Sequence, residues 1–381
     1  MNTQPIEPAR PALKSRPYDT IAVLGAGAWG SALATVARRA GRSVRVWGRD
    51  ADVIADINTH ARNERFLPGI DLAQGLLGTT DLAAALDGAQ AVLIVIPSIA
   101  IRQICADIAP LIAKGVPVAI CAKGIEQGTG YLMGHIAAEV LGDHPVGVIS
   151  GPTFADETAL GHFTAATVAF NFTYHDRLSP MDSPAARLAV SMSTLSFRTY
   201  ISDDLVGVEV GGAVKNVIAI ACGMMTGAGF AKNTRAALIT RGMDEMKQLA
   251  EALGGKRETV TGLSGAGDLT LTCSSDSSRN MSLGTQLGAG IPRDQCFDGR
   301  PVVVEGEHNA ITVTDLARRL GVSMPICEAV RRVLHDDADL AGTFARMWSS
   351  PIESEPRAMM GLSFDHPSGL IPVAPRDGVA S

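Results

Sequence analysis

The first half of the chain alternates short apolar runs with amphipathic stretches of helical period. The apolar runs are rich in β-branched residues and apolar on both faces, which is typical of strands buried in a parallel sheet. They cover residues 20–25, 43–47, 91–97, 116–124 and 145–153, and a last run, 193–201, follows a proline-bearing loop at 171–184. This pattern predicts an α/β fold with a doubly wound parallel sheet.

The second half has a different rhythm. From about residue 206 the strand pattern stops, and long helical patterns follow at 234–254 and 312–321. We therefore expect a sheet domain at 19–204 and an all-helical C-terminal domain at 205–350. A flexible leader (1–18) and a weakly ordered tail (351–381) complete the predicted organisation.

Length and composition narrow the classes of function. The 381 residues are 46% hydrophobic, enough for two cores, and the net charge of −6 without a basic patch argues against a nucleic-acid partner. Six scattered cysteines, no metal-ligand spacing and no secretory start predict a cytoplasmic protein with reduced thiols and no metal. Glu209, Lys215 and Asn216 interrupt the longest apolar run, so no transmembrane segment is expected.

The first predicted strand runs directly into GAGAWG, which has GxGxxG spacing and is followed by a helical pattern. Gly25 permits a tight turn, Gly27 lets the backbone approach a pyrophosphate, and Gly30 lets the helix pack on the strand. The alternative is a purely structural glycine turn. The context favours a dinucleotide site, so the sheet domain is interpreted as a Rossmann-like dinucleotide-binding domain.

The end of the second predicted strand bears on which dinucleotide is bound. The segment VRVWGRD places Arg49 before Asp50, where an acidic residue would hold a ribose 2′-hydroxyl. Arg49 would suit a 2′-phosphate, although a solvated surface arginine is the simpler alternative. Both NADP and NAD stay open.

A lysine inside the apolar run 206–227 is the strongest candidate for catalysis. Lys215 lies among glycines and alanines in VGGAVKNVIAIACGMM. A buried ammonium is costly unless it is paired, and small neighbours allow a ligand or another backbone to come close. A lysine that extends its head to water is the alternative.

Other polar residues lie at predicted helix starts and at the carboxyl ends of predicted strands, which are positions where proteins commonly bind ligands. Asp268 and Thr272 lie in GLSGAGDLTLTC, and SDSSRN, with Ser278, Arg279 and Asn280, reads as a helix N-terminus able to hold a phosphate or as a plain capped helix. Lys123 in CAKG and the turn SGPT follow the carboxyl ends of predicted strands, where open α/β sheets bind ligands.

Taken in order, the motifs GAGAWG, AKGIE, SGPTFADE, GGAVKNVIAIACGM, NTRAALITRG, GLSGAGDLTLTC, SSRN and VVEG resemble those of bacterial-type NAD(P)-dependent glycerol-3-phosphate dehydrogenases. The resemblance covers about residues 20–335. It departs from the family at Ala28, where Ser or Thr is frequent, and at Trp29, where Tyr or Phe is common.

The resemblance implies roles for particular residues. Lys215 matches the catalytic proton donor and acceptor, Asp268 its carboxylate partner, and Lys123 a residue that contacts both substrate and cofactor. The positions that match substrate contacts are Lys123, Gly151, Thr153, Lys215, Asp268, Ser278, Arg279 and Asn280. Those that match cofactor contacts are Gly25, Gly27, Ala28, Trp29, Gly30, Arg49, Lys123, Ala155, Arg279, Val303 and Glu305.

The implied reaction is the reversible NAD(P)H-dependent reduction of dihydroxyacetone phosphate to sn-glycerol 3-phosphate, which supplies glycerophospholipid synthesis, by a homodimer. Two other classes remain at this point: another two-domain β-hydroxyacid dehydrogenase, which would recognise a carboxylate, and a non-catalytic dinucleotide-sensing module, which would not need Lys215, Asp268 and SSRN together.

Overall fold

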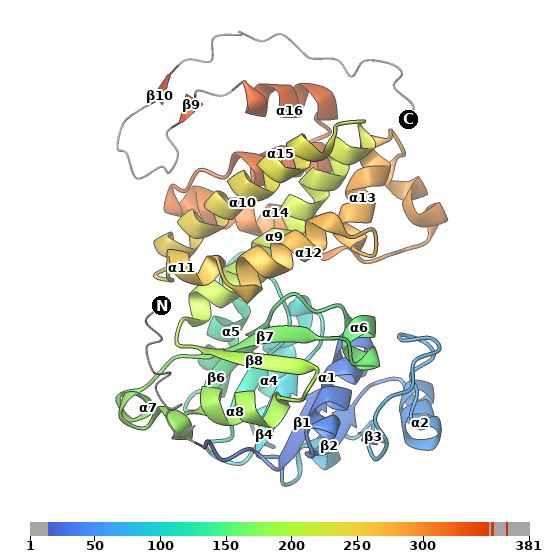
Figure 1. Cartoon of the computed structure of the whole chain (residues 1–381), viewed down its shortest axis with the longest axis vertical. Helices are drawn as coiled ribbons and strands as arrows, with labels where there is room; N and C mark the ends of the chain where they lie inside the picture. Colours follow the sequence, from blue (N-terminus) through green and yellow to red (C-terminus); the bar gives the residue numbers. More distant parts are fainter. Residues whose placement is uncertain (1–13, 350–351, 354–362, 365–381) are drawn as a thin grey trace, which may run out of the picture.

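The computed structural model describes residues 14–349, 352–353 and 363–364. An eight-stranded sheet with the order β3-β2-β1-β4-β5-β6-β7-β8 fills the first half, with helices on both faces (Figure 1). The strands are β1 (Thr20–Leu24), β2 (Ser43–Trp47), β3 (Leu77–Thr79), β4 (Ala91–Ile94), β5 (Val118–Ile120), β6 (Val146–Ser150), β7 (Thr164–Phe170) and β8 (Phe197–Ser202). The predicted Rossmann-like class is confirmed.

The sheet is not wholly parallel. Strands β1 to β6 run parallel, but β7 is antiparallel to β6, and the edge strand β8 follows the direction of β7. Neither β3 nor β7 was predicted, because LGT is short and the alanines of TAATVAF weaken a strand signal. The predicted loop at 171–184 contains a short helix whose first turn is closed by a Thr173–Asp176 capping box.

Helices alternate with the strands up to β8. They are α1 (Ala28–Arg39), α2 (Ala51–His60), α3 (Leu82–Leu86), η1 (Ser98–Ala100), α4 (Ile101–Ile108), α5 (Met133–Leu141), α6 (Ala155–Leu160), α7 (Tyr174–Leu178), η2 (Pro180–Asp182) and α8 (Pro184–Met192). Two apolar clusters, one on each face of the sheet, contain the buried side chains of these elements. The first half therefore has the layered core that its sequence pattern predicts.

Helices alone make up the region from α9 to residue 349. They are α9 (Leu205–Gly227), α10 (Lys232–Ala252), α11 (Arg257–Val260), η3 (Leu263–Gly267), α12 (Asp268–Ser274), α13 (Arg279–Gly288), η4 (Arg293–Gly299), α14 (Glu305–Leu320), α15 (Pro325–His335) and α16 (Leu340–Trp348). In Figure 1 they stack above the sheet with α9 at their centre. The all-helical prediction is confirmed for this region, whereas the exact domain division at residue 204 stays a prediction.

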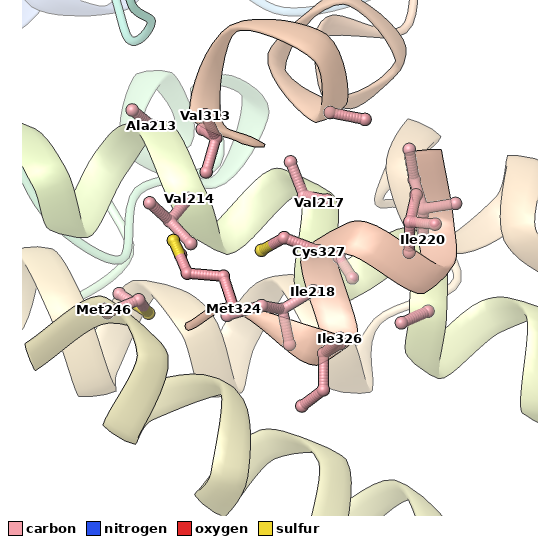
Figure 2. Close-up of a cluster of buried hydrophobic side chains, with 14 of the residues drawn as sticks. Ala213, Val214, Val217, Ile218, Ile220, Met246, Val313, Met324, Ile326 and Cys327 are labelled. Carbon is pink, nitrogen blue, oxygen red and sulfur yellow. The ribbon is translucent and has the colours of Figure 1, made fainter. Parts of the chain in front are cut away.

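The helical region is built around α9. This is the one helix in the described part of the chain that is long and apolar enough to cross a membrane, yet 94% of its most apolar 18-residue window is buried inside the protein. Figure 2 shows Val214, Val217 and Ile218 of α9 facing Met324 and Cys327 of the α15 segment. The helix is therefore apolar because it forms the core.

Glycines let α9 and α13 touch backbone to backbone. A Cβ atom on Gly223 would lie 2.2 Å from the Met281 carbonyl oxygen, and one on Gly284 would lie 2.2 Å from the Ile220 carbonyl oxygen. One turn further on, Gly227 and Gly288 are equally close to the opposite backbone. Much of the run of small residues in α9 is thus explained by this helix crossing.

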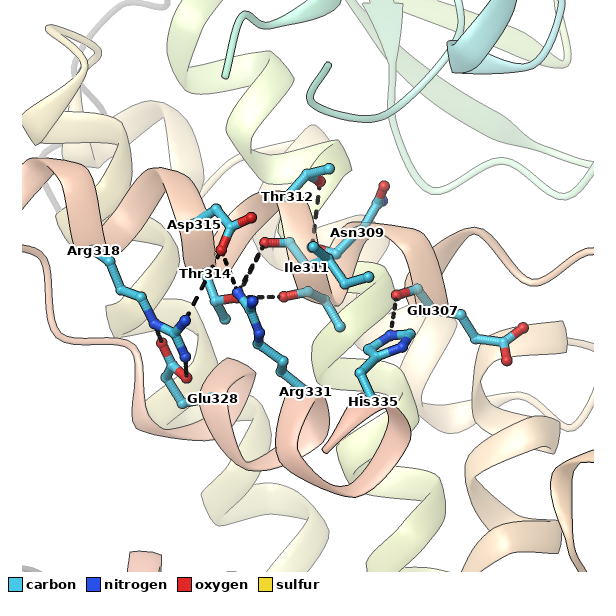
Figure 3. Close-up of polar contacts among 11 residues, drawn as sticks. Glu307, Asn309, Ile311, Thr312, Thr314, Asp315, Arg318, Glu328, Arg331 and His335 are labelled. Atoms are coloured by element: carbon cyan, nitrogen blue, oxygen red, sulfur yellow. Dashed lines mark hydrogen bonds and ion pairs between the residues drawn. The ribbon is translucent and has the colours of Figure 1, made fainter. Parts of the chain in front are cut away.

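Polar contacts hold α15 against α14 (Figure 3). Arg318 donates two hydrogen bonds to Glu328, at 2.7 and 2.6 Å, and Arg331 donates to the Thr314 hydroxyl at 2.7 Å and pairs with Asp315. These contacts fix α14, whose first residue, Glu305, is one of the predicted site residues.

The chain ends are described only in part. Within the predicted leader, residues 1–13 lie outside the described residues, but Tyr18 is buried, and its amide donates to the Ser191 hydroxyl at 2.7 Å. Of the predicted tail, only β9 (Ile352–Glu353) and β10 (Ser363–Phe364) are described, and they pair antiparallel.

Candidate active site

The GAGAWG turn has the geometry that a dinucleotide requires. Gly25 has φ +126°, and a Cβ there would lie 2.1 Å from the Val95 carbonyl oxygen, while one on Gly30 would lie 1.8 Å from the Gly25 carbonyl oxygen. Space opens in front of Gly27, which begins α1 without a side-chain cap and without an acidic residue in the first turn. The free N–H groups of this turn fit a pyrophosphate, so NAD(P) fits this end of the sheet.

The two residues after β2 have different environments. Arg49 is exposed. Asp50 caps α2 by accepting from the Asp52 and Val53 amides at 3.0 and 3.3 Å, and its other oxygen pairs with Arg65. Asp50 would have to give up these contacts to hold a ribose hydroxyl, whereas Arg49 is available for a 2′-phosphate.

Lys215, Asp268 and Lys123 meet in one buried cluster. The Lys215 ammonium donates to Asp268 Oδ1 at 2.7 Å, and the Lys123 ammonium donates to Asp268 Oδ2 at 2.6 Å. Lys215 also donates to the Thr272 hydroxyl at 2.8 Å. The structure therefore brings together all three predicted catalytic residues, from α9, α12 and the end of β5.

Close packing brings these elements together. A Cβ on Gly211 of α9 would lie 2.7 Å from the Ser264 carbonyl oxygen, so the turn that leads into Asp268 is pressed against α9. A Cβ on Gly212 would lie 3.0 Å from Lys123 Cγ. The two glycines one turn before Lys215 thus leave room for the elements that carry its two charged partners.

Two ammonium groups share one carboxylate, and this sets the charges of the cluster. Burial lowers the pKa of Lys215 to about 8 and the charge of Lys123 adds to this effect, although the Asp268 carboxylate acts against it. Burial also opposes the charged form of Lys123, but Asp268 outweighs it and raises the Lys123 pKa. Burial alone would raise the pKa of Asp268, but the two lysines hold it below its usual range. Lys215 is thus the group that can exchange a proton near neutral pH.

A polar network adjoins the cluster at Asn216. Asn216 donates to Glu305 at 3.2 Å and accepts from Asn280 at 3.1 Å, and the Asn280 oxygen accepts from the Gly306 amide at 2.9 Å. The network joins α9 to the first turns of α13 and α14. It therefore fixes the predicted residues Asn280 and Glu305 relative to Lys215.

The SSRN segment forms a capped helix start. This agrees with one of the two interpretations of its sequence, a capped helix. The Ser278 hydroxyl accepts from the Met281 amide at 3.2 Å, which makes it the cap of α13. Arg279 is exposed and donates to the Val303 carbonyl oxygen at 2.9 Å. The second reading, a phosphate site, stays a prediction that would rest on Arg279 and on the first-turn N–H groups.

The SGPT turn lies beside Asp268. A Cβ on Gly267 would lie 3.4 Å from the Pro152 ring, so the turn that carries Gly151 and Thr153 touches the residue before Asp268. Ala155 begins α6 directly after this turn. The Ala28 and Trp29 side chains are half-buried in the first turn of α1, and Val303 is exposed.

The sequence assigns no role to three polar residues that the structure places in or near the cluster. The sequence marks Thr272 and Asn216 only as polar residues, and Glu209 only as a charge that argues against a membrane span. Each lies in a mostly apolar helix, and the same signal that singled out Lys215 would have found them.

Neither metal sites nor disulfide bonds are found among the described residues. Within the described residues no group of His, Cys, Asp and Glu side chains could hold a metal ion. All six cysteines are free and buried.

Comparison with known proteins agrees with this geometry. The N-terminal family model of NAD-dependent glycerol-3-phosphate dehydrogenase matches residues 20–175, and the C-terminal model matches 204–344. A protein of Rhodospirillum rubrum named glycerol-3-phosphate dehydrogenase (NAD(P)+) is 48% identical over 337 residues, 88% of this chain and 94% of that protein. One of Parvibaculum lavamentivorans with the same name is 45% identical over 89% of this chain and 98% of its own.

Solved structures extend the agreement to three dimensions. The crystal structure of glycerol-3-phosphate dehydrogenase from Coxiella burnetii has a TM-score of 0.79 and 37% identity, and the match covers 87% of this chain and 99% of that one. With both halves of the sequence matched and close relatives along almost the whole of their length, the chain belongs to the NAD-dependent glycerol-3-phosphate dehydrogenase family.

Proposed function

We propose that this chain catalyses the NAD(P)-dependent interconversion of dihydroxyacetone phosphate and sn-glycerol 3-phosphate, with Lys215 as the proton donor and acceptor. The observation that carries the assignment is the Lys215–Asp268–Lys123 cluster at the same end of the parallel strands as the dinucleotide turn. Neither a dinucleotide sensor nor a carboxylate-binding β-hydroxyacid dehydrogenase accounts for the matches to both family models. Oxidation of NADPH or NADH that depends on dihydroxyacetone phosphate is the direct test, and no oxidation with either cofactor would refute the proposal.

Each residue of the cluster has a distinct task in this reaction. When bound, the nicotinamide supplies or accepts the hydride at C2 of the substrate. Negative charge develops on the C2 oxygen during reduction, and the Lys215 ammonium stabilises that charge and then donates a proton to the oxygen. In oxidation the neutral Lys215 amine takes the proton back. Asp268 and Thr272 orient the amine, and the Lys123 charge favours its neutral form.

The remaining site residues would surround the reacting groups. Arg279 and the first turn of α13 would bind the substrate phosphate, with Ser278 and Asn280 shaping that turn, and Gly151 and Thr153 would line the substrate site. The cofactor would contact Gly25, Gly27, Ala28, Trp29, Gly30, Arg49, Lys123, Ala155, Arg279, Val303 and Glu305. The proposal also includes a cytoplasmic homodimer that supplies glycerophospholipid synthesis, and a monomeric mass in solution would refute its dimeric part.

The proposed role of Lys215 predicts opposite pH dependences for the two directions. The neutral amine is the base, so kcat/KM for glycerol 3-phosphate oxidation is expected to rise as the pH increases through about 8. The ammonium is the acid, so kcat/KM for reduction is expected to fall over the same window. Initial rates in both directions from pH 6 to 10 provide the measurement.

A variant of Lys123 serves as the control for this pH dependence. Lys123→Met removes a positive charge that lowers the Lys215 pKa, so both inflections should move to higher pH. Profiles of the parent that are flat between pH 7 and 9 in both directions would contradict the role of Lys215.

If Arg49 binds the 2′-phosphate of NADPH, its loss should weaken the binding of NADPH but not of NADH. Because a charged hydrogen bond is worth about 1.5–3 kcal/mol, Arg49→Ala should raise KM for NADPH about ten- to hundredfold. KM for NADH should change little, since NADH has no 2′-phosphate. Equal changes for the two cofactors would show that Arg49 does not contact the 2′-phosphate.

A further inference from the structure

A small internal cavity lies behind the cluster, on the side of α9 that carries Glu209. Its volume is about 10 Å³, about the space that one water molecule needs. Lys123, Ser150, Glu209 and Gly212 are among its lining residues. Within the described residues the Ser150 hydroxyl is one of two buried side-chain oxygens with no hydrogen-bond partner, and Ser150 is only 6% exposed. A water molecule in this cavity would therefore have the unpaired Ser150 hydroxyl as a partner, with Glu209 in the cavity wall.

Glu209 borders two cavities. Besides the small one, it lines a second, open cavity of about 1050 Å³ between the sheet and the helical region. Its carboxylate accepts a hydrogen bond from the Gly134 amide at 2.7 Å, and so holds the first turn of α5. The titratable groups that share the larger cavity with it are Tyr131, His135, Asp143, His144, Asp176 and Arg319.

We propose that a water molecule in the small cavity, together with Glu209, forms a proton path between the solvent and the active-site lysines. This inference rests on the proton-transfer role proposed above for Lys215. It assigns a function in the reaction to Glu209 and Ser150, neither of which belongs to the substrate or cofactor site described above.

The proton balance of the path closes. After Lys215 has given its proton to the substrate oxygen, the Lys123 ammonium, which donates to the other oxygen of the same Asp268 carboxylate, gives a proton to the Lys215 amine. In the same concerted step the water passes a proton to Lys123 and takes one from the Glu209 carboxyl group, so Lys123 keeps its charge, as its raised pKa requires. Glu209 finally regains a proton from solvent in the larger cavity. Oxidation runs the same transfers in reverse.

The proton affinity of Glu209 suits this task. Burial raises its pKa to about 7, although the amides of Gly134 and Met133 act in the opposite direction. A carboxyl group with this pKa gains and loses protons readily at neutral pH.

The test separates the first turnover from later ones. Glu209→Gln keeps an oxygen to accept from the Gly134 amide but cannot carry a proton. Lys215 starts protonated, so a stopped-flow trace of NADPH oxidation by dihydroxyacetone phosphate at pH 7 should show a normal first turnover. Later turnovers should slow about tenfold or more, within the range of general acid–base contributions. KM should be unchanged, and added imidazole should restore the rate.

A matched control comes from the same chain. Glu245 is likewise a buried glutamate that accepts from a helix start, the Ile326 amide at 2.6 Å, but it lines neither cavity. Glu245→Gln should therefore leave both phases at parent rates and show no imidazole effect.

Each alternative outcome contradicts the path. Parent-like later turnovers in Glu209→Gln, or an equally slow first turnover, would overturn it. Should Glu209→Gln not fold, Ser150→Ala replaces it, because loss of the hydroxyl should also slow later turnovers, and parent behaviour of Ser150→Ala would overturn the path. If Glu209→Gln keeps parent rates while a Lys215 variant is inactive, the proton path is refuted but the proposed function is not.

Discussion

Lys215→Met is expected to lower kcat for dihydroxyacetone phosphate reduction by about 10²- to 10⁴-fold, the contribution of a positioned general acid. Methionine fills nearly the same volume as lysine, so the tightly packed α9 should keep its place. NADPH should still bind, because the dinucleotide turn lies at the start of α1 and does not include Lys215. Steady-state assays and fluorescence titration with NADPH measure the two effects separately.

An exposed lysine controls for the loss of charge. Lys256 pairs with Asp203 at 2.7 Å, and its side chain is 56% exposed. Lys256→Met should keep the parent kcat. A Lys215→Met enzyme with near-normal turnover would remove the basis for the proton-transfer role of Lys215.

Gly284→Ala is expected to lower the free energy of unfolding by about 1–3 kcal/mol, the usual cost of overpacking. In an ordinary helix the same change stabilises by up to about 1 kcal/mol, so the sign of the effect is itself informative. The new methyl group would lie 2.2 Å from the Ile220 carbonyl oxygen, and backbone atoms of α9 cannot move without moving the helix. Urea denaturation measures the change.

The same substitution should weaken substrate binding, because α13 carries Asn280, which hydrogen-bonds Asn216 next to Lys215. Ser282→Ala on the same helix adds no atom and should change stability by less than about 0.5 kcal/mol. Stabilisation by Gly284→Ala would show that α9 and α13 are less close than described.

Local sequence patterns were enough to predict much of the fold and several of the site residues. Strand runs apolar on both faces predicted the buried sheet, and GAGAWG between a strand and a helix predicted the dinucleotide turn. These features were readable because hydrophobic periodicity and glycine geometry are properties of neighbouring residues. The alanine-rich β7 was not predicted, because its residues give only a weak local strand signal. Its antiparallel direction could not be predicted either, because it depends on pairing with β6.

Lys215 and Asp268 were both visible as polar residues in unusual places, but their pairing was implied only by resemblance. Across their sequence separation of 53, nothing in the sequence signals that one carboxylate bridges Lys215 and Lys123. Asn216 and Glu209 were just as visible in the same apolar run, yet received no role.

The sequence by itself determined the strand and helix pattern, the glycine turn at α1 and the unusual placing of a lysine in an apolar helix, because each follows from the chemistry of adjacent residues. Only the tertiary structure decided which glycines face a backbone and which face Lys123, that Asp50 caps α2, and that Glu209 stands between two cavities. Those facts depend on contacts between residues far apart in the chain, where burial and charge combine to set the proton affinity of Lys215.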